Sequence, residues 1–322
     1  MDDRFSALDA WLRAQLAGEP FRVERASTDA SFRRYFRVFL DGRTLIAMDA
    51  PPEREDSRAF VKVAGLLREA GLNAPEILAH DFAQGFLLVT DLGTRLYLQA
   101  LREGDPKPLF GDATTALVRW QASSKPGVLP GYDETLLRRE LSLFPDWYVA
   151  RHLSVTLSEA QRDSLERVFR AILARNLAEP RVYVHRDFMP RNLMVSGPNP
   201  GILDFQDAVH GPISYDVACL YRDAFLSWDE EVVLDGTIRY WEKARAAGLP
   251  VREDFGDFWR DVEWMGLQRH LKVLGIFARL NYRDGKAGYL GDTPRFIGYV
   301  RHAVSRYGEL APLGKLLDEL AA

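Results

Sequence analysis

The turn-rich segment SGPNPG, at residues 196–201 between two short apolar runs, constrains this chain more than any other feature. It predicts a hairpin with strands at residues 193–195 and 202–204. Folding of this hairpin brings Asn192, just before the first strand, next to Asp204, at the end of the second. Amide and carboxylate oxygens at one point suit Mg²⁺, so these two residues are predicted metal ligands.

Asp187 lies five residues before Asn192, on the loop that leads into the hairpin. This placement is close enough for its carboxylate to accept a proton from a hydroxyl that attacks a metal-bound phosphate. We therefore predict that Asp187 is a general base. His185 is expected to support the loop through hydrogen bonds rather than to react. Asp207 is expected to be a turn residue rather than a further metal ligand.

The motif H-x-D-x4-N that begins at His185, followed by Asp204, resembles the catalytic loop and metal-binding aspartate of the protein-kinase-like fold. Since FQ rather than FG follows Asp204, the variant looks like that of the aminoglycoside and choline phosphotransferase family. The segment GPISYDVACLYRD, at residues 211–223, resembles a helix start of the same family. Its aspartate, here Asp216, would brace the catalytic loop, and an ordinary helix N-cap is the alternative.

This resemblance implies an α+β fold with two lobes. Residues 1–92 would form a small N-lobe with an antiparallel sheet, and residues 93–322 a larger, mainly helical C-lobe. The residue pattern agrees. Residues 21–92 are strand-like around one helix at residues 57–70, and the runs FRRYFRVFL and TLIAM, on either side of the DG turn at residues 41–42, predict a hairpin. The chain beyond is mostly helical in pattern. The N-terminus predicts an amphipathic helix with Phe5, Leu8, Leu12 and Leu16 on one side.

The loop ASTDASF, at residues 26–32, stands where the family places its phosphate-covering loop, but it contains no glycine. Ser27, Thr28 and Ser31 are expected to offer backbone N–H groups and hydroxyls to phosphates, and a plain hairpin loop is the alternative. The segment TDLG that starts at residue 90 resembles the hinge that holds adenine through its backbone. The resemblance thus implies ATP as cofactor, with Thr90, Asp91 and Leu92 next to its adenine.

In the family that the chain resembles, the third strand carries a lysine that pairs with phosphate and with an acid on the following helix. In this chain Met48 or Asp49 stands where that lysine would be. A replacement cation is therefore expected. Arg33, the arginine nearest to the loop, is favoured and Arg34 is second, while Lys62 could also reach inward. A solvated strand arginine is the alternative for either arginine.

The resemblance implies that helices of the C-lobe build the acceptor site, so their charge should complement that of the substrate. Between residues 265 and 290, five basic side chains stand against Asp284 alone. Such a surface would repel a polycationic aminoglycoside but not an anionic or neutral sugar. A solvated basic face unrelated to substrate remains open.

Five further segments are DASFRRYFRV, IAMDAPPE, LLVTDLG, ELSLFPDWYVARHL and LQRHLKVLGIFARLNYRDGK. Together they are similar to the anomeric N-acetylmuramate and N-acetylglucosamine kinases of cell-wall recycling. This implies transfer of the γ-phosphoryl group of ATP to the C1 hydroxyl of one or both amino sugars in peptidoglycan recycling, with Mg²⁺ as the metal. N-acetylmuramate carries a lactyl carboxylate, and Arg269 and Arg279 are the candidates to bind it. Trp147, on the same stretch as Glu140, could give a sugar ring an apolar face, or pack between helices.

Two other functions remain open. One is a kinase for choline, ethanolamine or an aminoglycoside, and the other is a nucleotide-binding pseudokinase. The composition narrows the partners: 42 Lys plus Arg against 46 Asp plus Glu argue against a dedicated nucleic-acid binder, and the single Cys219 excludes an internal disulfide. No signal peptide or 18-residue apolar run is present, so we expect a cytoplasmic protein without a membrane partner. The oligomeric state is left open.

Overall fold

The structure is a computed structural model of the chain and describes residues 3–26 and 32–321. The chain forms two compact units. Unit 1 comprises Met1–Asp105 and Asn192–Asp207, and unit 2 comprises Pro106–Arg191 and Ala208–Ala322. The lobe boundary expected between residues 92 and 93 stays a prediction.

Within its described residues, unit 1 contains a five-stranded antiparallel sheet of order β1-β2-β3-β5-β4. The strands are β1 (Arg22–Arg25), β2 (Arg34–Leu40), β3 (Arg43–Asp49), β4 (Ile77–Asp81) and β5 (Phe86–Thr90). The predicted hairpin is confirmed, because β2 pairs with β3 around a turn in which Gly42 has a φ of +69°.

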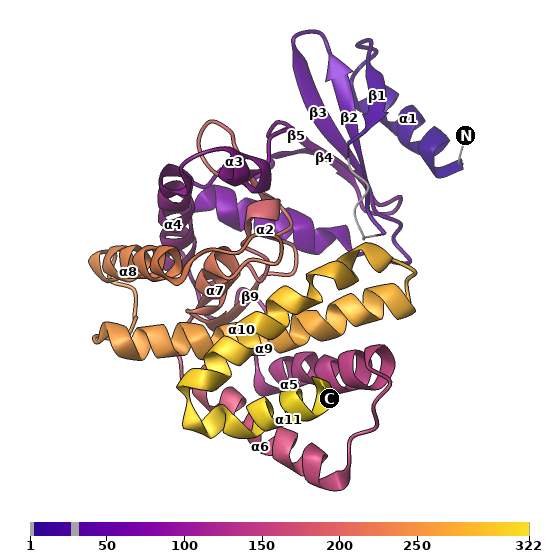
Figure 1. The fold of residues 1–322 in the computed structure, drawn as a ribbon. Helices are drawn as coiled ribbons and strands as arrows, with labels where there is room; N and C mark the ends of the chain where they lie inside the picture. Colours follow the sequence, from indigo (N-terminus) through magenta and orange to yellow (C-terminus); the bar gives the residue numbers. More distant parts are fainter. Residues whose placement is uncertain (1–2, 27–31, 322) are drawn as a thin grey trace. The chain divides into compact units, whose positions relative to one another are not determined.

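Helix α1 (Asp3–Gln15) covers one face of this sheet (Figure 1). Leu8 and Leu12 are fully buried there against strand side chains such as Val38 and Leu88. The predicted amphipathic N-terminal helix is therefore confirmed. Because Leu87 and Val89 are buried on the opposite face, β5 is enclosed on both sides, as its continuous apolar sequence requires.

Helix α2 (Ser57–Glu69) begins where the Asp56 carboxylate accepts the backbone N–H of Arg58 at 3.0 Å. Its Phe60 ring lies 4.7 Å, centroid to centroid, from that of Phe205. The remaining elements of unit 1 are α3 (Tyr97–Glu103) and a short hairpin of β7 (Leu193–Met194) and β8 (Gly201–Ile202), with the 3₁₀ turn η2 (Pro190–Asn192) leading into it. The hairpin expected from the turn-rich segment is thus present.

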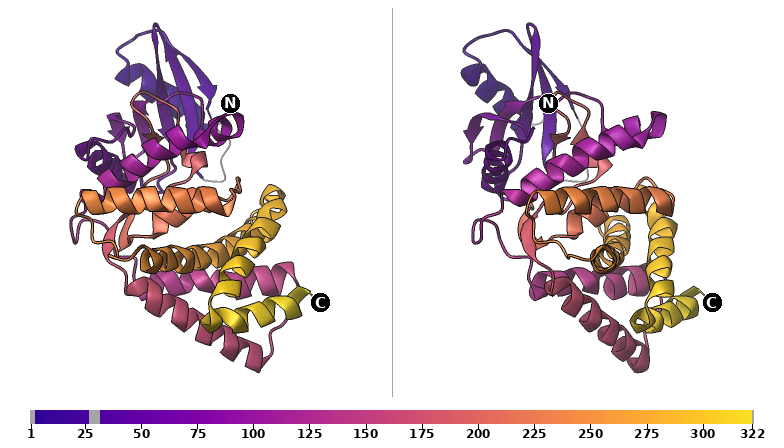
Figure 2. Two further views of the ribbon diagram at one scale, coloured as in Figure 1. Left: turned by 60° about the vertical axis from the view of Figure 1, so that its left-hand side comes forward. Right: turned by 90° about the vertical axis from the view of Figure 1, so that its left-hand side faces the viewer.

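Unit 2 is mainly helical and is built around α9 (Phe255–Tyr282), which contacts α5, α6, α7, α8 and α10. Figure 2, right, views α9 nearly along its axis, with other helices of the unit around it. These are α4 (Pro106–Ala122), α5 (Glu134–Leu143), the π-helical η1 (Phe144–His152), α6 (Glu159–Leu177), α7 (Tyr215–Tyr221), α8 (Glu230–Ala246), α10 (Thr293–Arg306) and α11 (Ala311–Ala321), with 3₁₀ turns η3 (Ala287–Asp292) and η4 (Gly308–Leu310).

A two-stranded ladder in unit 2, β6 (Arg181–Val184) with β9 (Val209–Pro212), was not expected as a pair from the sequence. It anchors both ends of the segment that carries the H-x-D-x4-N motif. The sheet of unit 1 and the helices of unit 2 confirm the α+β class. In the part of the chain that the structure describes, no helix combines the length and apolarity needed to cross a membrane.

Candidate functional site

The β7–β8 hairpin brings Asn192 and Asp204 together in unit 1. Leu193 pairs with Ile202, and the backbone N–H of Leu203 donates to the Asn192 carbonyl at 2.9 Å. The Asn192 amide lies 3.3 Å from Asp204 Oδ2. Asn192 is buried, whereas Asp204 is exposed. The hairpin therefore presents one amide and one carboxylate at a single point, as its spacing predicts.

These two side chains fit a divalent cation. Carboxylate and amide oxygens are hard ligands of the kind that Mg²⁺ binds, and rotation of the amide by half a turn directs its oxygen to the same point. Gln206, which sequence reasoning left without a role, donates its amide to Asp204 Oδ1 at 2.9 Å. Such a partner orients a ligating carboxylate. Its only sequence signal is its position two residues after Asp204.

Asp216, in the first turn of α7, supports the loop that carries Asp187. The Asp216 carboxylate accepts the backbone N–H groups of His185 and Arg186, at 2.6 and 3.0 Å. The backbone N–H of Asp187 donates to His185 Nδ1 at 3.3 Å. Burial raises the pKa of Asp216 to about 7, an effect that the two N–H donors partly offset. The N-cap of α7 is Ser214, so Asp216 contacts the loop rather than capping the helix.

The acceptor candidates lie in different environments of unit 2. Glu140 is 5 % exposed and pairs with Arg186 and Lys272. Arg269 is 2 % exposed and donates to the Arg222 carbonyl at 3.3 Å. Trp147 packs, half-buried, against the core, and Arg279 is half-buried. Contact of these four side chains with a substrate stays a prediction.

Of the nucleotide candidates, Ser27, Thr28 and Ser31 lie outside the described residues. Thr90 and Asp91 use their side chains within unit 1: the Thr90 hydroxyl accepts the N–H of Glu76 at 2.9 Å, and Arg37 donates to Asp91 at 2.6 Å. The side chain of Leu92 lies beside Gly201, where an added Cβ would approach it to 3.0 Å.

Strand β3 carries a buried carboxylate where the resemblance leads one to expect a lysine. Asp49 is fully buried and accepts hydrogen bonds from Arg4, at 2.9 Å, and Arg34, at 2.8 Å. Arg33 instead pairs with Glu55 at 2.7 Å, with 11 % of its side chain exposed. Arg34 thus completes a structural ion pair. The resemblance implies that the family's lysine pairs with an acid on the following helix, whereas Glu55 stands just before α2.

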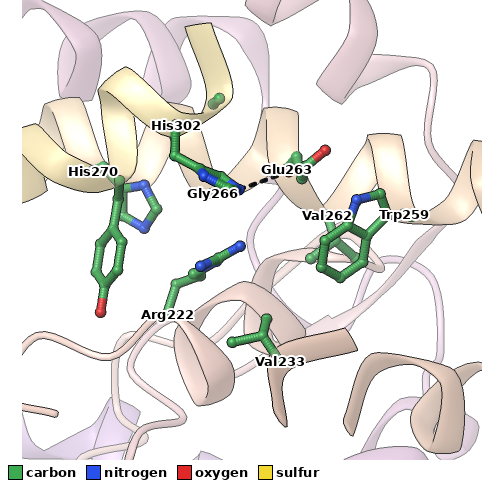
Figure 3. Close-up of a pocket in the computed structure, with 10 residues that line it drawn as sticks. Arg222, Val233, Trp259, Val262, Glu263, Gly266, His270 and His302 are labelled. Atoms are coloured by element: carbon green, nitrogen blue, oxygen red, sulfur yellow. Dashed lines mark ion pairs between the residues drawn. The ribbon is translucent and has the colours of Figure 1, made fainter. Parts of the chain in front are cut away.

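A second cluster of ionisable side chains in unit 2 lies at a small pocket, which Arg222, Glu263 and His302 help to line (Figure 3). Glu230, Glu263 and His302 each offer one ligand atom, and these atoms lie within 4.8 Å of one another. Arg306 pairs with both carboxylates, at 2.6 and 2.9 Å, and Arg222 lies 3.8 Å from Glu230. Because two guanidinium groups balance two carboxylates, the cluster has no net negative charge to attract a cation. Several walls of the pocket are apolar: Val233, Trp259, Val262 and Ala303.

Comparison with known proteins gives one consistent result. A family model described as the phosphotransferase enzyme family matches residues 22–255. The chain is 54 % identical to an N-acetylmuramate/N-acetylglucosamine kinase of Pseudomonas aeruginosa, over 99 % of this chain and 97 % of that protein. It is 49 % identical to a protein of the same name from Neisseria meningitidis, over 97 % and 95 %.

Among solved structures, a choline/ethanolamine kinase family protein from Mesorhizobium loti superposes with a TM-score of 0.65, over 95 % of this chain and 97 % of that one. Its sequence identity of 17 % means that this likeness shows the fold alone. The fold predicted from the catalytic segment, protein-kinase-like and α+β, is confirmed.

Proposed function

The chain belongs to the phosphotransferase enzyme family, and from that premise we propose that it is an ATP-dependent sugar kinase of peptidoglycan recycling. Its acceptor is the anomeric C1 hydroxyl of N-acetylmuramate, N-acetylglucosamine or both. The observation that carries the proposal is the near full-length similarity to kinases named for these two sugars. The choice of C1 rests on the resemblance of the sequence segments to anomeric kinases.

In this proposal Asp187 orients the acceptor hydroxyl and takes its proton as the oxygen bonds to the γ-phosphorus and the bond from that phosphorus to ADP breaks, so that ADP leaves. Asn192 and Asp204 would hold Mg²⁺, and Gln206, which donates to Asp204, would keep that carboxylate oriented. When bound there, the cation offsets the negative charge of the phosphate oxygens. Asp216 supports the loop through its two backbone contacts.

For the nucleotide, we assign the phosphate-binding cation to Arg33. Arg34 and Arg4 both hold the buried Asp49, and Arg33 pairs with Glu55 beside the start of α2. Backbone groups at residues 90–92 would hold the adenine, and Ser27, Thr28 and Ser31 would cover the phosphates.

The test is ADP release from Mg²⁺-ATP with N-acetylmuramate, N-acetylglucosamine, choline and kanamycin, measured side by side. We expect turnover with the amino sugars and none with the two cations, because residues 265–290 carry five basic side chains against Asp284 alone. Turnover with choline or kanamycin would overturn the acceptor. No turnover with any acceptor, together with tight binding of ATP, would make the chain a pseudokinase.

A further inference from the structure

Glu140, on α5, lies at the centre of a buried polar network in unit 2. Its Oε1 accepts from Arg186 Nη2 at 2.5 Å and from Lys272 Nζ at 2.9 Å. Its Oε2 accepts from Gln268 Nε2 at 3.1 Å and from the hydroxyl of Tyr132. Glu140 thus joins two residues of α9 to Arg186, the residue immediately before Asp187.

The network is charged as well as hydrogen-bonded. Burial by itself would raise the pKa of Glu140, but the charges of Lys272 and Arg186 and the Tyr132 hydroxyl lower it to about 2. The Arg186 guanidinium also lies 5.5 Å from the centre of the Tyr132 ring. Glu140 therefore carries a full negative charge at neutral pH, and Arg186 is held both by that charge and by an aromatic face.

Arg186 needs holding because its backbone is strained. Its φ is +77°, in the left-handed region that side chains with a Cβ seldom adopt. Its N–H is bound by Asp216 on α7, at 3.0 Å. Its carbonyl accepts the thiol of Cys219, also on α7, at 3.4 Å. The backbone of Arg186 is thus fixed from α7, and its side chain from α5 and α9.

We propose that Glu140 is a positioning residue, which holds the Arg186 side chain and so fixes the peptide unit that carries Asp187. The inference rests on the base role of Asp187 given under Proposed function. It goes beyond that role because it links the orientation of Asp187 to α5 and α9.

The presence of a buried ion network around Glu140 supports a role for this residue beyond stability. Well-packed apolar residues commonly replace buried ion pairs with no loss of stability, so stability alone does not require these charges. A charge-assisted bond to the residue next to the base does fix one orientation, and small displacements of a base lower the rate steeply.

The test compares Glu140→Gln with a matched variant, Asp261→Asn. Asp261, on α9, is 1 % exposed and pairs with Arg175 and Arg252, both at 2.8 Å. It lies eleven residues before Lys272, about 16 Å along the helix axis. We expect Glu140→Gln to lower kcat by about 100-fold with the KM for ATP changed less than about twofold. Asp261→Asn should lose thermal stability but keep kcat.

A double variant, Glu140→Gln with Lys272→Met, separates positioning from folding. It removes one buried charge of each sign, so it should recover thermal stability relative to the single variant while kcat stays low. Recovery of kcat together with stability would overturn the proposal, as would a single variant with unchanged kcat. If the single variant does not fold, the double variant alone decides.

Amide hydrogen exchange of the peptide that contains residues 183–189 provides a readout that needs no acceptor. We expect faster exchange in this peptide for Glu140→Gln and for the double variant, and no change for Asp261→Asn. Unchanged exchange in the double variant would overturn the proposal even if the wild-type enzyme is inactive with amino sugars. Inactivity of the wild-type enzyme, by contrast, concerns only the proposed function.

Discussion

Aspartate takes different roles in this chain according to its surroundings. Asp49 is fully buried between two arginines and is structural. Asp216 is equally buried, but its oxygens accept backbone N–H groups of a loop. Asp204 is exposed and contacts two side-chain amides. Only the last environment leaves a carboxylate accessible to a metal ion from solvent, which supports the proposed division of labour.

The residue with the largest expected effect on rate is Asp187. In Asp187→Asn an amide replaces the carboxylate that is proposed to take the proton, so kcat should fall by between about 100-fold and 10,000-fold. Binding of ATP, followed by calorimetry, should be unchanged because the shape of the side chain is kept. Turnover at the wild-type rate would contradict the proposed base.

Metal binding is tested by Asp204→Ala, with Asp207→Ala as its matched control. Both aspartates are exposed and lie three residues apart. The first variant should lose the Mg²⁺ dependence of nucleotide binding, because its carboxylate is the charged member of the proposed ligand pair. The second should keep it. A titration of nucleotide with and without Mg²⁺ checks both, and equal behaviour of the two variants would count against the assignment.

At the scale of elements, the packing of α9 depends on a glycine. A Cβ added at Gly275 would lie 2.3 Å from the carbonyl carbon of Leu143, at the end of α5. Such an approach leaves no room for a side chain. The contact fixes α9 against α5. Glu140, on α5, contacts Gln268 and Lys272 of α9.

We therefore expect Gly275→Ala to destabilise the protein by about 1–3 kcal/mol or more, because backbone must move. Gly298→Ala, in α10, is the matched control, since among the described residues no atom beyond its chain neighbours and the backbone of its own helix lies within 4 Å of its added Cβ. That variant should be neutral or gain up to about 1 kcal/mol from helix propensity. Thermal unfolding of the two variants decides, and equal midpoints would contradict the close packing.

The network around Glu140 also predicts an acid response. Its pKa is about 2 in the folded chain, against an ordinary value of 4.5. The unfolded chain thus takes up a proton at this position that the folded chain does not, and stability falls as the pH drops from about 4.5 toward 2. The contribution is on the order of 3 kcal/mol. Urea unfolding across this range should show a shallower pH slope for Glu140→Gln, and equal slopes would contradict the network.

At the scale of the whole molecule, the sequence predicted what is local. The turn-rich segment predicted the β7–β8 hairpin and the meeting of Asn192 with Asp204. Alternation and helical spacing predicted the β2–β3 hairpin, α1 and α2. The fold was predicted from the resemblance of the H-x-D-x4-N segment to the catalytic loop of the protein-kinase-like fold.

Contacts between distant residues were not predictable in this way. Glu140 and Lys272 are far apart in sequence, and only the packing of α5 on α9 makes them partners. A pattern that places Glu140 on a helix does not say whether its carboxylate pairs with a cation of a neighbouring helix or binds a substrate. The pairing of β6 with β9 has the same origin, since its strands flank the whole catalytic segment.

The position of phosphorylation tests the proposed function most directly. Two analogues of N-acetylglucosamine serve: the methyl glycoside, whose C1 hydroxyl is blocked, and the 6-deoxy sugar, which lacks the C6 hydroxyl. With Mg²⁺-ATP, we expect turnover of the 6-deoxy sugar, a glycosyl phosphate in the phosphorus NMR spectrum of its product, and no turnover of the methyl glycoside. Turnover of the methyl glycoside with an inert 6-deoxy sugar would contradict anomeric transfer.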